Sequence, residues 1–142
     1  MDMHAPPPGA KSFFRPHNLW WLPDRLFTFG MAEREAKAYH RPGYTMGVAG
    51  PALRAVPLSS YERGEPLKGR SKRRKWVLYL PEGSVPGLEG DSLLLVHCWQ
   101  ELSAWEAAWS HPRFIAQASP DIAKQVVDLL KDWIDAHLSP ST

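Results

Sequence analysis

The pattern of hydrophobic and polar residues indicates regular structure mainly in the second half of the chain. The five residues from Trp76 to Leu80 are apolar or aromatic and precede Pro81, which predicts a strand over 76–80. Residues 92–99 are mostly apolar on both alternating faces, which predicts a second strand that is covered on both sides. We expect two helices after these strands, over 104–111 and 120–138.

The starts of these two helices carry recognisable capping signals. Ser103 and Glu106 form an S-x-x-E capping box at the start of the first helix. Ser119 is a candidate N-cap for the second helix, and Pro120 follows at its first position. One face of this second helix is lined by Ile122, Val126, Leu129, Leu130, Trp133 and His137.

The first half of the chain is broken by proline and glycine. Nine of the 14 prolines and six of the ten glycines fall within residues 1–66. Because helices and central strands tolerate few such residues, we expect a long irregular Pro-rich arm over 1–66, with one short helix at 31–40. The predicted fold class is α+β: a compact domain over 67–142 in which the two C-terminal helices cover a small sheet.

Six large aromatic residues within 12–30 are interrupted by Pro16 and Pro23, so this segment cannot form one long helix. Leaving such rings in water costs about 25 cal/mol per Å² of apolar surface, so they must pack against something. They pack either on the core of their own domain or in a groove of a partner. We expect them to be partner-binding residues, namely Phe13, Phe14, Trp20, Trp21, Phe27 and Phe29.

The positive charge of the chain is concentrated in one place. The net charge is +2, yet outside residues 68–75 there are 11 basic and 15 acidic residues. Such a run serves as a solvated or partner-facing loop, as a contact for a polyanion such as RNA, or as a targeting signal. We expect a polyanion or partner contact made by Lys68, Arg70, Lys72, Arg73, Arg74 and Lys75.

No catalytic motif is evident, and we expect neither a cofactor nor a metal site. The six histidines lack metal-binding spacings such as H-x-x-x-H. Cys98 is the single cysteine, so no internal disulfide forms, and we expect it to be buried. His97 and Trp99 share one face of the predicted strand over 92–99. They either line a pocket or belong to the core.

The segment 76–115 resembles the last part of dimeric α+β-barrel proteins, the antibiotic-biosynthesis-monooxygenase-like and stress-response barrel families. In both, a final strand leads into a helix with a similar aromatic, Glu and His-Pro-x-Phe pattern. The matching residues here are Trp99, Trp105, Glu106, His111, Pro112 and Phe114. The resemblance implies a ferredoxin-like half-barrel and carries no active site over to this chain.

These features together favour a non-catalytic accessory subunit of a larger complex, docked through the aromatic arm and the basic run. Two alternatives remain: a nucleic-acid-associated protein of ribosomal type, and a small α+β-barrel enzyme or ligand binder. Apolar runs are too short for a membrane helix. We expect an intracellular protein that is soluble or peripheral and has other protein subunits as partners. The organelle is left open by the sequence, and the mitochondrion is one option.

Overall fold

The computed structural model describes residues 13–27, 40–61 and 74–138. The strands are β1 (Asn18–Pro23), β2 (His40–Ala49), β3 (Ala52–Tyr61), β4 (Val77–Leu80), β5 (Asp91–Leu95), β6 (Gln100–Ser103) and β7 (Arg113–Gln117). The helices are α2 (Ala104–Trp109) and α3 (Pro120–His137), with short 3-10 turns η1 (Asp24–Leu26), η3 (Arg74–Trp76) and η4 (Val96–Cys98).

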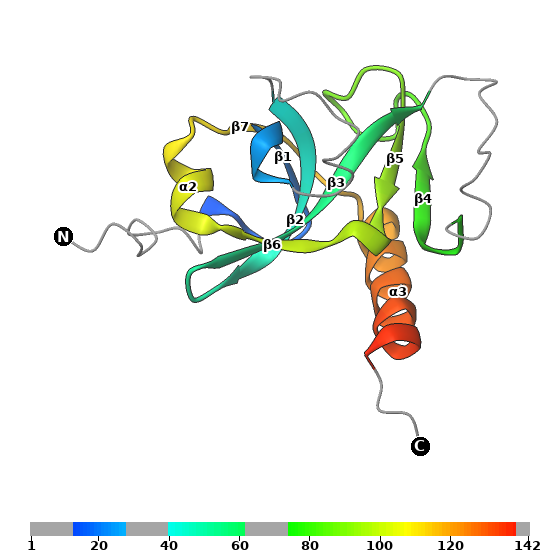
Figure 1. Cartoon of the computed structure of the whole chain (residues 1–142). Helices are drawn as coiled ribbons and strands as arrows, with labels where there is room; N and C mark the ends of the chain where they lie inside the picture. The colour runs from blue at the N-terminus through cyan, green and yellow to red at the C-terminus, as the bar shows by residue number, and fades with distance from the viewer. Residues whose placement is uncertain (1–12, 28–39, 62–73, 139–142) are drawn as a thin grey trace.

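The strands form one curled antiparallel sheet in the order β4-β5-β3-β2-β1-β7, with β6 pairing β3 beside β5 (Figure 1). The long strand β3 pairs with β2 on one side. On its other side it pairs first with β6, over Ala52–Ala55, and then with β5, over Leu58–Tyr61. The architecture is therefore an α+β fold with a curled sheet and a C-terminal helix.

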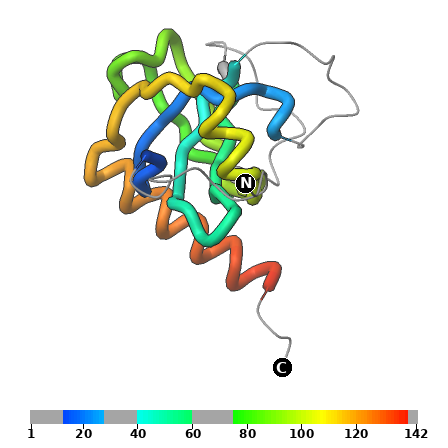
Figure 2. The backbone as a smooth tube through the Cα atoms, turned by 90° about the vertical axis from the view of Figure 1, so that its left-hand side faces the viewer, coloured from blue at the N-terminus to red at the C-terminus, as the bar shows by residue number. Residues whose placement is uncertain are grey.

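Both faces of the sheet are covered, each with its own hydrophobic core. In β1, Leu19 belongs to the core on the α3 side, whereas Trp20 and Leu22 belong to the core on the α2 side. This alternation follows from the two-residue period of a strand. Figure 1 shows α3 packed beneath β4 and β5, and Figure 2 shows from the side how α3 runs out past the sheet.

The C-terminal helix begins as the sequence predicts. The Ser119 hydroxyl accepts a hydrogen bond from the Ile122 N–H at 3.2 Å, and Pro120 occupies the first turn. Ile122 and Val126 are buried against the sheet. The expected helix over 104–111 is shorter, because α2 ends at Trp109. The expected cover of one small sheet by two helices is not confirmed, since α2 and α3 join different cores.

The expected irregular arm over 1–66 is not confirmed either, because β1, β2 and β3 lie within it. Pro42 and Pro57 are tolerated in these strands for local reasons. Pro42 lies in the part of β2 that pairs with β1 only. Pro57 lies where β3 has left β6 and not yet met β5, so on that side the ladder is interrupted. The sheet takes strands from both sides of the expected boundary between 66 and 67.

Candidate functional site

A pocket of about 530 Å³ opens at one end of the sheet. The end of β1, the start of β2 and the end of β3 meet here, because these strands are antiparallel neighbours. We call it the strand-end pocket. It is lined by Trp21, His40, Arg41, Pro42, Leu58, Ser59, Gly87, Leu88, Glu89 and Ser92.

The segment 81–90 between β4 and β5 closes one side of the pocket. Asp91 accepts a hydrogen bond from the Glu82 N–H at 2.8 Å, and the Pro81 carbonyl accepts one from the Ser84 hydroxyl at 2.6 Å. Val85 is buried in the core on the α3 side. Gly87 has φ +91°, and a Cβ there would lie 3.2 Å from Ile115 on β7. The loop is thus fixed at both ends and packed closely over the sheet.

Arg41 is the charged group that the fold holds most firmly at this pocket. Its Nε donates to Asp24 Oδ1 at 2.6 Å, and its Nη1 donates to the Leu58 carbonyl at 2.8 Å. The two charged side chains are 13% and 3% exposed. A partly buried guanidinium with fixed donors is suited to an oxyanion such as phosphate or carboxylate.

His40 precedes Arg41 on β2 and also lines the pocket. Its Nε2 is buried and has no hydrogen-bond partner among the residues that the structure describes. Buried polar atoms in proteins almost always have a partner, since leaving one without costs about 1–3 kcal/mol. Because His40 lines the pocket, a ligand bound there is one group that would complete this nitrogen.

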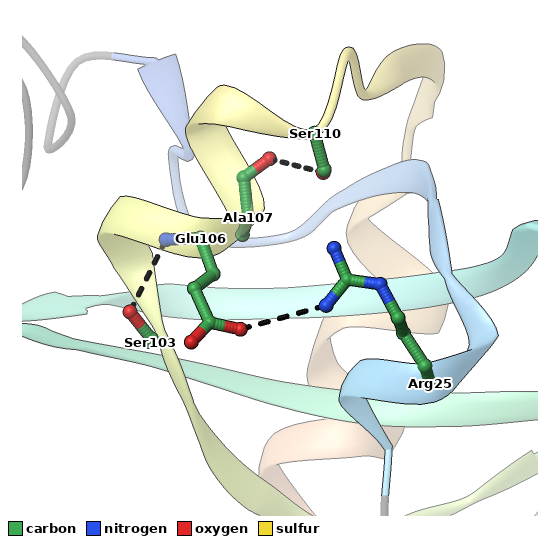
Figure 3. Close-up of polar contacts among 5 residues, drawn as sticks. All are labelled: Arg25, Ser103, Glu106, Ala107 and Ser110. Carbon is green, nitrogen blue, oxygen red and sulfur yellow. Dashed lines mark hydrogen bonds and ion pairs between the residues drawn. The ribbon is translucent and has the colours of Figure 1, made fainter.

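The turn that carries Asp24 is linked to α2 on the surface. The Ser103 hydroxyl accepts a hydrogen bond from the Glu106 N–H at 3.1 Å, which caps α2 as predicted (Figure 3). The Glu106 carboxylate lies 3.6 Å from Arg25 on η1. In the same view the Ser110 hydroxyl donates to the Ala107 carbonyl at 2.7 Å, at the end of α2. Of these contacts, only the exposed ion pair between Arg25 and Glu106 joins α2 to η1.

The structure buries three of the six aromatic residues in their own domain. Phe14, Trp20 and Phe27 are buried in the core on the α2 side. Phe13 is 45% exposed and its ring lies 4.7 Å from that of Trp20. Trp21 lines the strand-end pocket instead. Phe29 lies outside the described residues, as does the expected helix at 31–40 except for His40, which begins β2.

Of the basic run, only the side chain of Lys75 lies among those described. It is 3.6 Å from Asp132 on α3, and Asp132 also accepts a hydrogen bond from the Trp76 indole at 3.0 Å. Lys68, Arg70, Lys72 and Arg73 lie outside the described residues, and only the backbone of Arg74 is described, within η3. Their role as a polyanion or partner contact stays a prediction.

His97 and Cys98 lie in η4 rather than in a strand, because β5 ends at Leu95. The Trp99 ring packs at 5.8 Å against Trp133 of α3, and neither His97 nor Trp99 lines the strand-end pocket. Within 13–27, 40–61 and 74–138, no group of three or more His, Cys, Asp or Glu residues is placed to hold a metal ion. No helix in these ranges is long and apolar enough to cross a membrane.

The sequence interpretation missed His40 and Arg41. We expected His40 to end the short helix at 31–40 and Arg41 to lie in the irregular stretch after it, whereas both begin β2. The sequence did contain one signal for this site, namely the two polar residues His40 and Arg41 at the start of the extended stretch 40–49.

The fold, once known, connects the chain to solved structures. A MazE–MazF complex from Deinococcus radiodurans matches with TM-score 0.54 and 18% identity, over 89% of this chain and 95% of that chain. MazF alone from this organism gives TM-score 0.54 and 18% identity, over 84% and 94%. The toxin MazF-mt6 from Mycobacterium tuberculosis gives 0.53 and 10%, over 83% and 96%. No family model and no curated protein matches the sequence.

These likenesses correct two expectations. A barrel-like α+β fold is supported, but the assignment to the antibiotic-biosynthesis-monooxygenase-like and stress-response barrels is not, because the neighbours are MazF proteins. The expected non-catalytic, structural accessory subunit is wrong, because the solved neighbours are MazF proteins, of which MazF-mt6 is a toxin.

Proposed function

We propose that this chain is a MazF-like ribonuclease that cleaves RNA in the strand-end pocket. Its structural neighbours are MazF proteins, which are RNA-cleaving toxins. The observation that carries the proposal is local to this chain: Arg41 and the unsatisfied Nε2 of His40 line one pocket. Their chemistry fits a phosphodiester.

Arg41 supplies the positive charge that a phosphate needs. Charge-assisted hydrogen bonds from a guanidinium to phosphate oxygens are strong and directional. During cleavage, negative charge builds up on the non-bridging oxygens at phosphorus. A fixed cation in a partly buried site stabilises that charge without further reorganisation.

His40 supplies proton transfer. In RNA the 2′-hydroxyl oxygen attacks the adjacent phosphorus, and the bond from phosphorus to the 5′-oxygen breaks. The 2′-hydroxyl gives up its proton, and the departing 5′-oxygen takes one. An imidazole suits either transfer, because its ordinary pKa lies close to neutral pH. The products are a 2′,3′-cyclic phosphate and a 5′-hydroxyl end.

The remaining walls suit a nucleotide. Trp21 offers an aromatic face for stacking of a base, which is worth about 1–3 kcal/mol per base. Ser59 and Glu89 add a hydroxyl and a carboxylate to the lining. Because the reaction uses the 2′-hydroxyl of the substrate, DNA of the same sequence would bind without being cut.

The test is cleavage of a single-stranded RNA and of the matching DNA by the purified chain. We expect RNA to be cut to 2′,3′-cyclic phosphate ends, and the DNA to stay intact. Arg41→Gln should lower the rate about 10²–10³-fold, and His40→Gln about 10²–10⁴-fold.

Arg54→Gln is the matched control. Arg54 lies on the same sheet but is half exposed, and its guanidinium is 4.0 Å from Glu101 on β6. It does not line the strand-end pocket, so the variant should cleave at the unmodified rate. Cleavage of DNA at the same rate as RNA, or full activity of the Arg41 variant, would refute the proposal.

A protein partner is part of the proposal as well. Three of the solved neighbours are complexes of MazE with MazF, which supports a protein partner for this chain. Exposed Phe13 and the basic run at 68–75 remain the proposed contacts for a partner or for RNA. A location inside an organelle has no support among these neighbours.

A further inference from the structure

A buried carboxylate stands directly behind the arginine of the strand-end pocket. Asp24 is 2% exposed and accepts a hydrogen bond from Arg41 Nε at 2.6 Å. The Leu58 carbonyl accepts a second one from Nη1 at 2.8 Å. Two acceptors from different elements, the turn η1 and the strand β3, thus bind two different nitrogens of one planar group.

The position of Asp24 is itself fixed. The turn η1 is closed by a hydrogen bond from the Phe27 N–H to the Asp24 carbonyl at 3.1 Å. The Phe27 side chain is fully buried in the core on the α2 side. Its ring contacts the backbone of β2 at Gly43, where a Cβ would lie 2.9 Å from Phe27 Cζ. The carboxylate therefore cannot follow Arg41 if the arginine moves.

We propose that Asp24 is a positioning residue for Arg41. Together with the Leu58 carbonyl it fixes the plane of the guanidinium at the pocket, so that an incoming phosphate meets it in one orientation. A guanidinium has five N–H donors, so one group can hold Asp24, the Leu58 carbonyl and a phosphate oxygen together. The inference rests on the proposed ribonuclease function, since it names the residue that orients the phosphate-binding group.

The opposite role would be a latch, in which Asp24 competes with phosphate for Arg41. A latch has to release the arginine, and its carboxylate has to move or become solvated. Asp24 is nearly inaccessible to water and lies on a turn held by a buried ring. The two roles differ in sign: a positioning residue speeds cleavage, whereas a latch slows it.

The experiment compares RNA cleavage by the full chain and by Asp24→Asn, Arg41→Gln and the double variant. Asn keeps the shape of the side chain and removes its charge. We expect Asp24→Asn to cleave about 10²-fold more slowly, as small displacements of a reacting group do. In the Arg41→Gln background the same change should have no further effect on rate, because Asp24 acts through Arg41. A merely structural role would slow both backgrounds equally.

Arg25→Gln is the matched control, since it alters the neighbouring residue on η1. It removes only the ion pair with Glu106, whose two side chains are 65% and 46% exposed. This variant should cleave at the unmodified rate. Loss of activity in it comparable to that of Asp24→Asn would show that η1 is sensitive to any change, and would overturn the specific role of Asp24.

A measurement on the unmodified chain covers the case in which Asp24→Asn does not fold. The Nε–H of Arg41 should exchange slowly with water in ¹⁵N NMR, because a buried carboxylate holds it. Rapid exchange at that nitrogen would overturn the inference. If the unmodified protein cleaves RNA and Asp24→Asn cleaves it equally fast or faster, the inference about Asp24 fails while the proposed function stands. Unmodified protein that cleaves no RNA would overturn the proposed function, and the inference with it.

Discussion

Gly43 on β2 is the position where a single added methyl group should test the packing behind the site. A Cβ there would lie 2.9 Å from Phe27 Cζ and 3.2 Å from Leu22 Cδ1. Carbon atoms pack best at about 3.5–4.0 Å, so both contacts are too close. Phe27 and Leu22 are fully buried, and neither side chain has solvent into which it can swing.

The size of the effect follows from two opposing terms. Forcing an extra carbon into a packed core costs about 1–3 kcal/mol. Replacing glycine by alanine in a compatible backbone stabilises by about 0.4–1 kcal/mol, because the unfolded chain loses freedom. Gly43→Ala should therefore lower the free energy of unfolding by about 1–2 kcal/mol.

The assay is urea unfolding of four proteins: the unmodified chain, Gly43→Ala, Phe27→Leu and the double variant. Leucine has no atom at the place of Cζ, so Phe27→Leu removes the closest clash at a cost of about 1 kcal/mol. The double variant should be more stable than the sum of the single losses predicts, by about 1 kcal/mol. Strict additivity would show that the two sites do not touch and would refute the packing described here.

Three further predictions concern stability. Burial raises the pKa of Tyr44 above its ordinary value of 10.0. The contribution of Tyr44 to the free energy of unfolding is therefore complete below pH 10 and falls as the pH rises further. In unfolding measurements at pH 9–11, the unmodified chain should lose about 1.4 kcal/mol more per pH unit above 10 than Tyr44→Phe. Ser119→Ala should destabilise the chain by about 0.5–2 kcal/mol in urea, because the Ile122 N–H loses its acceptor. Lys124→Gln should change stability by less than about 0.5 kcal/mol in the same assay, because its i,i+4 partner Asp128 is exposed; a larger change would show that this ion pair is not solvated.

Part of the second half of the fold could be predicted because its signals are local, although the short strands β6 and β7 were not expected. The α3 helix carries an N-cap, a proline in its first turn and a continuous apolar face, and it begins where these place it. The strand β4 falls within the apolar run at 76–80, and β5 begins one residue before the run at 92–99 and covers its first part. The second run ends early as a strand, because Val96–Cys98 form a 3-10 turn, which contacts α3.

The first half could not be predicted, because its strands depend on distant partners. Residues 40–61 contain Pro42, Pro51 and Pro57, and local rules favour a loop. In the sheet, two of these prolines fall where one side of their strand is unpaired, and Pro51 follows Gly50 (φ +58°) at the turn between β2 and β3. Such pairing involves residues far apart in the sequence, which a local pattern does not report.

The candidate site was missed for the same reason. Trp21, Arg41 and Ser59 come from three strands, and only the sheet brings them to one pocket. The basic run, by contrast, is conspicuous in the sequence, and it directed the functional interpretation toward a surface contact. Asp24 gave no signal at all, since one acidic residue after a proline is typical of any turn.

The most direct test of the central claim is to find where RNA binds on the chain. A single-stranded RNA with 2′-O-methyl groups cannot be cleaved through the 2′-oxygen, so it forms a stable complex for NMR. We predict that the signals of His40 and of the Trp21 indole shift when this RNA is added. The exposed Trp109 indole of α2 should not respond. Saturable binding that leaves His40 and Trp21 unchanged would contradict the account.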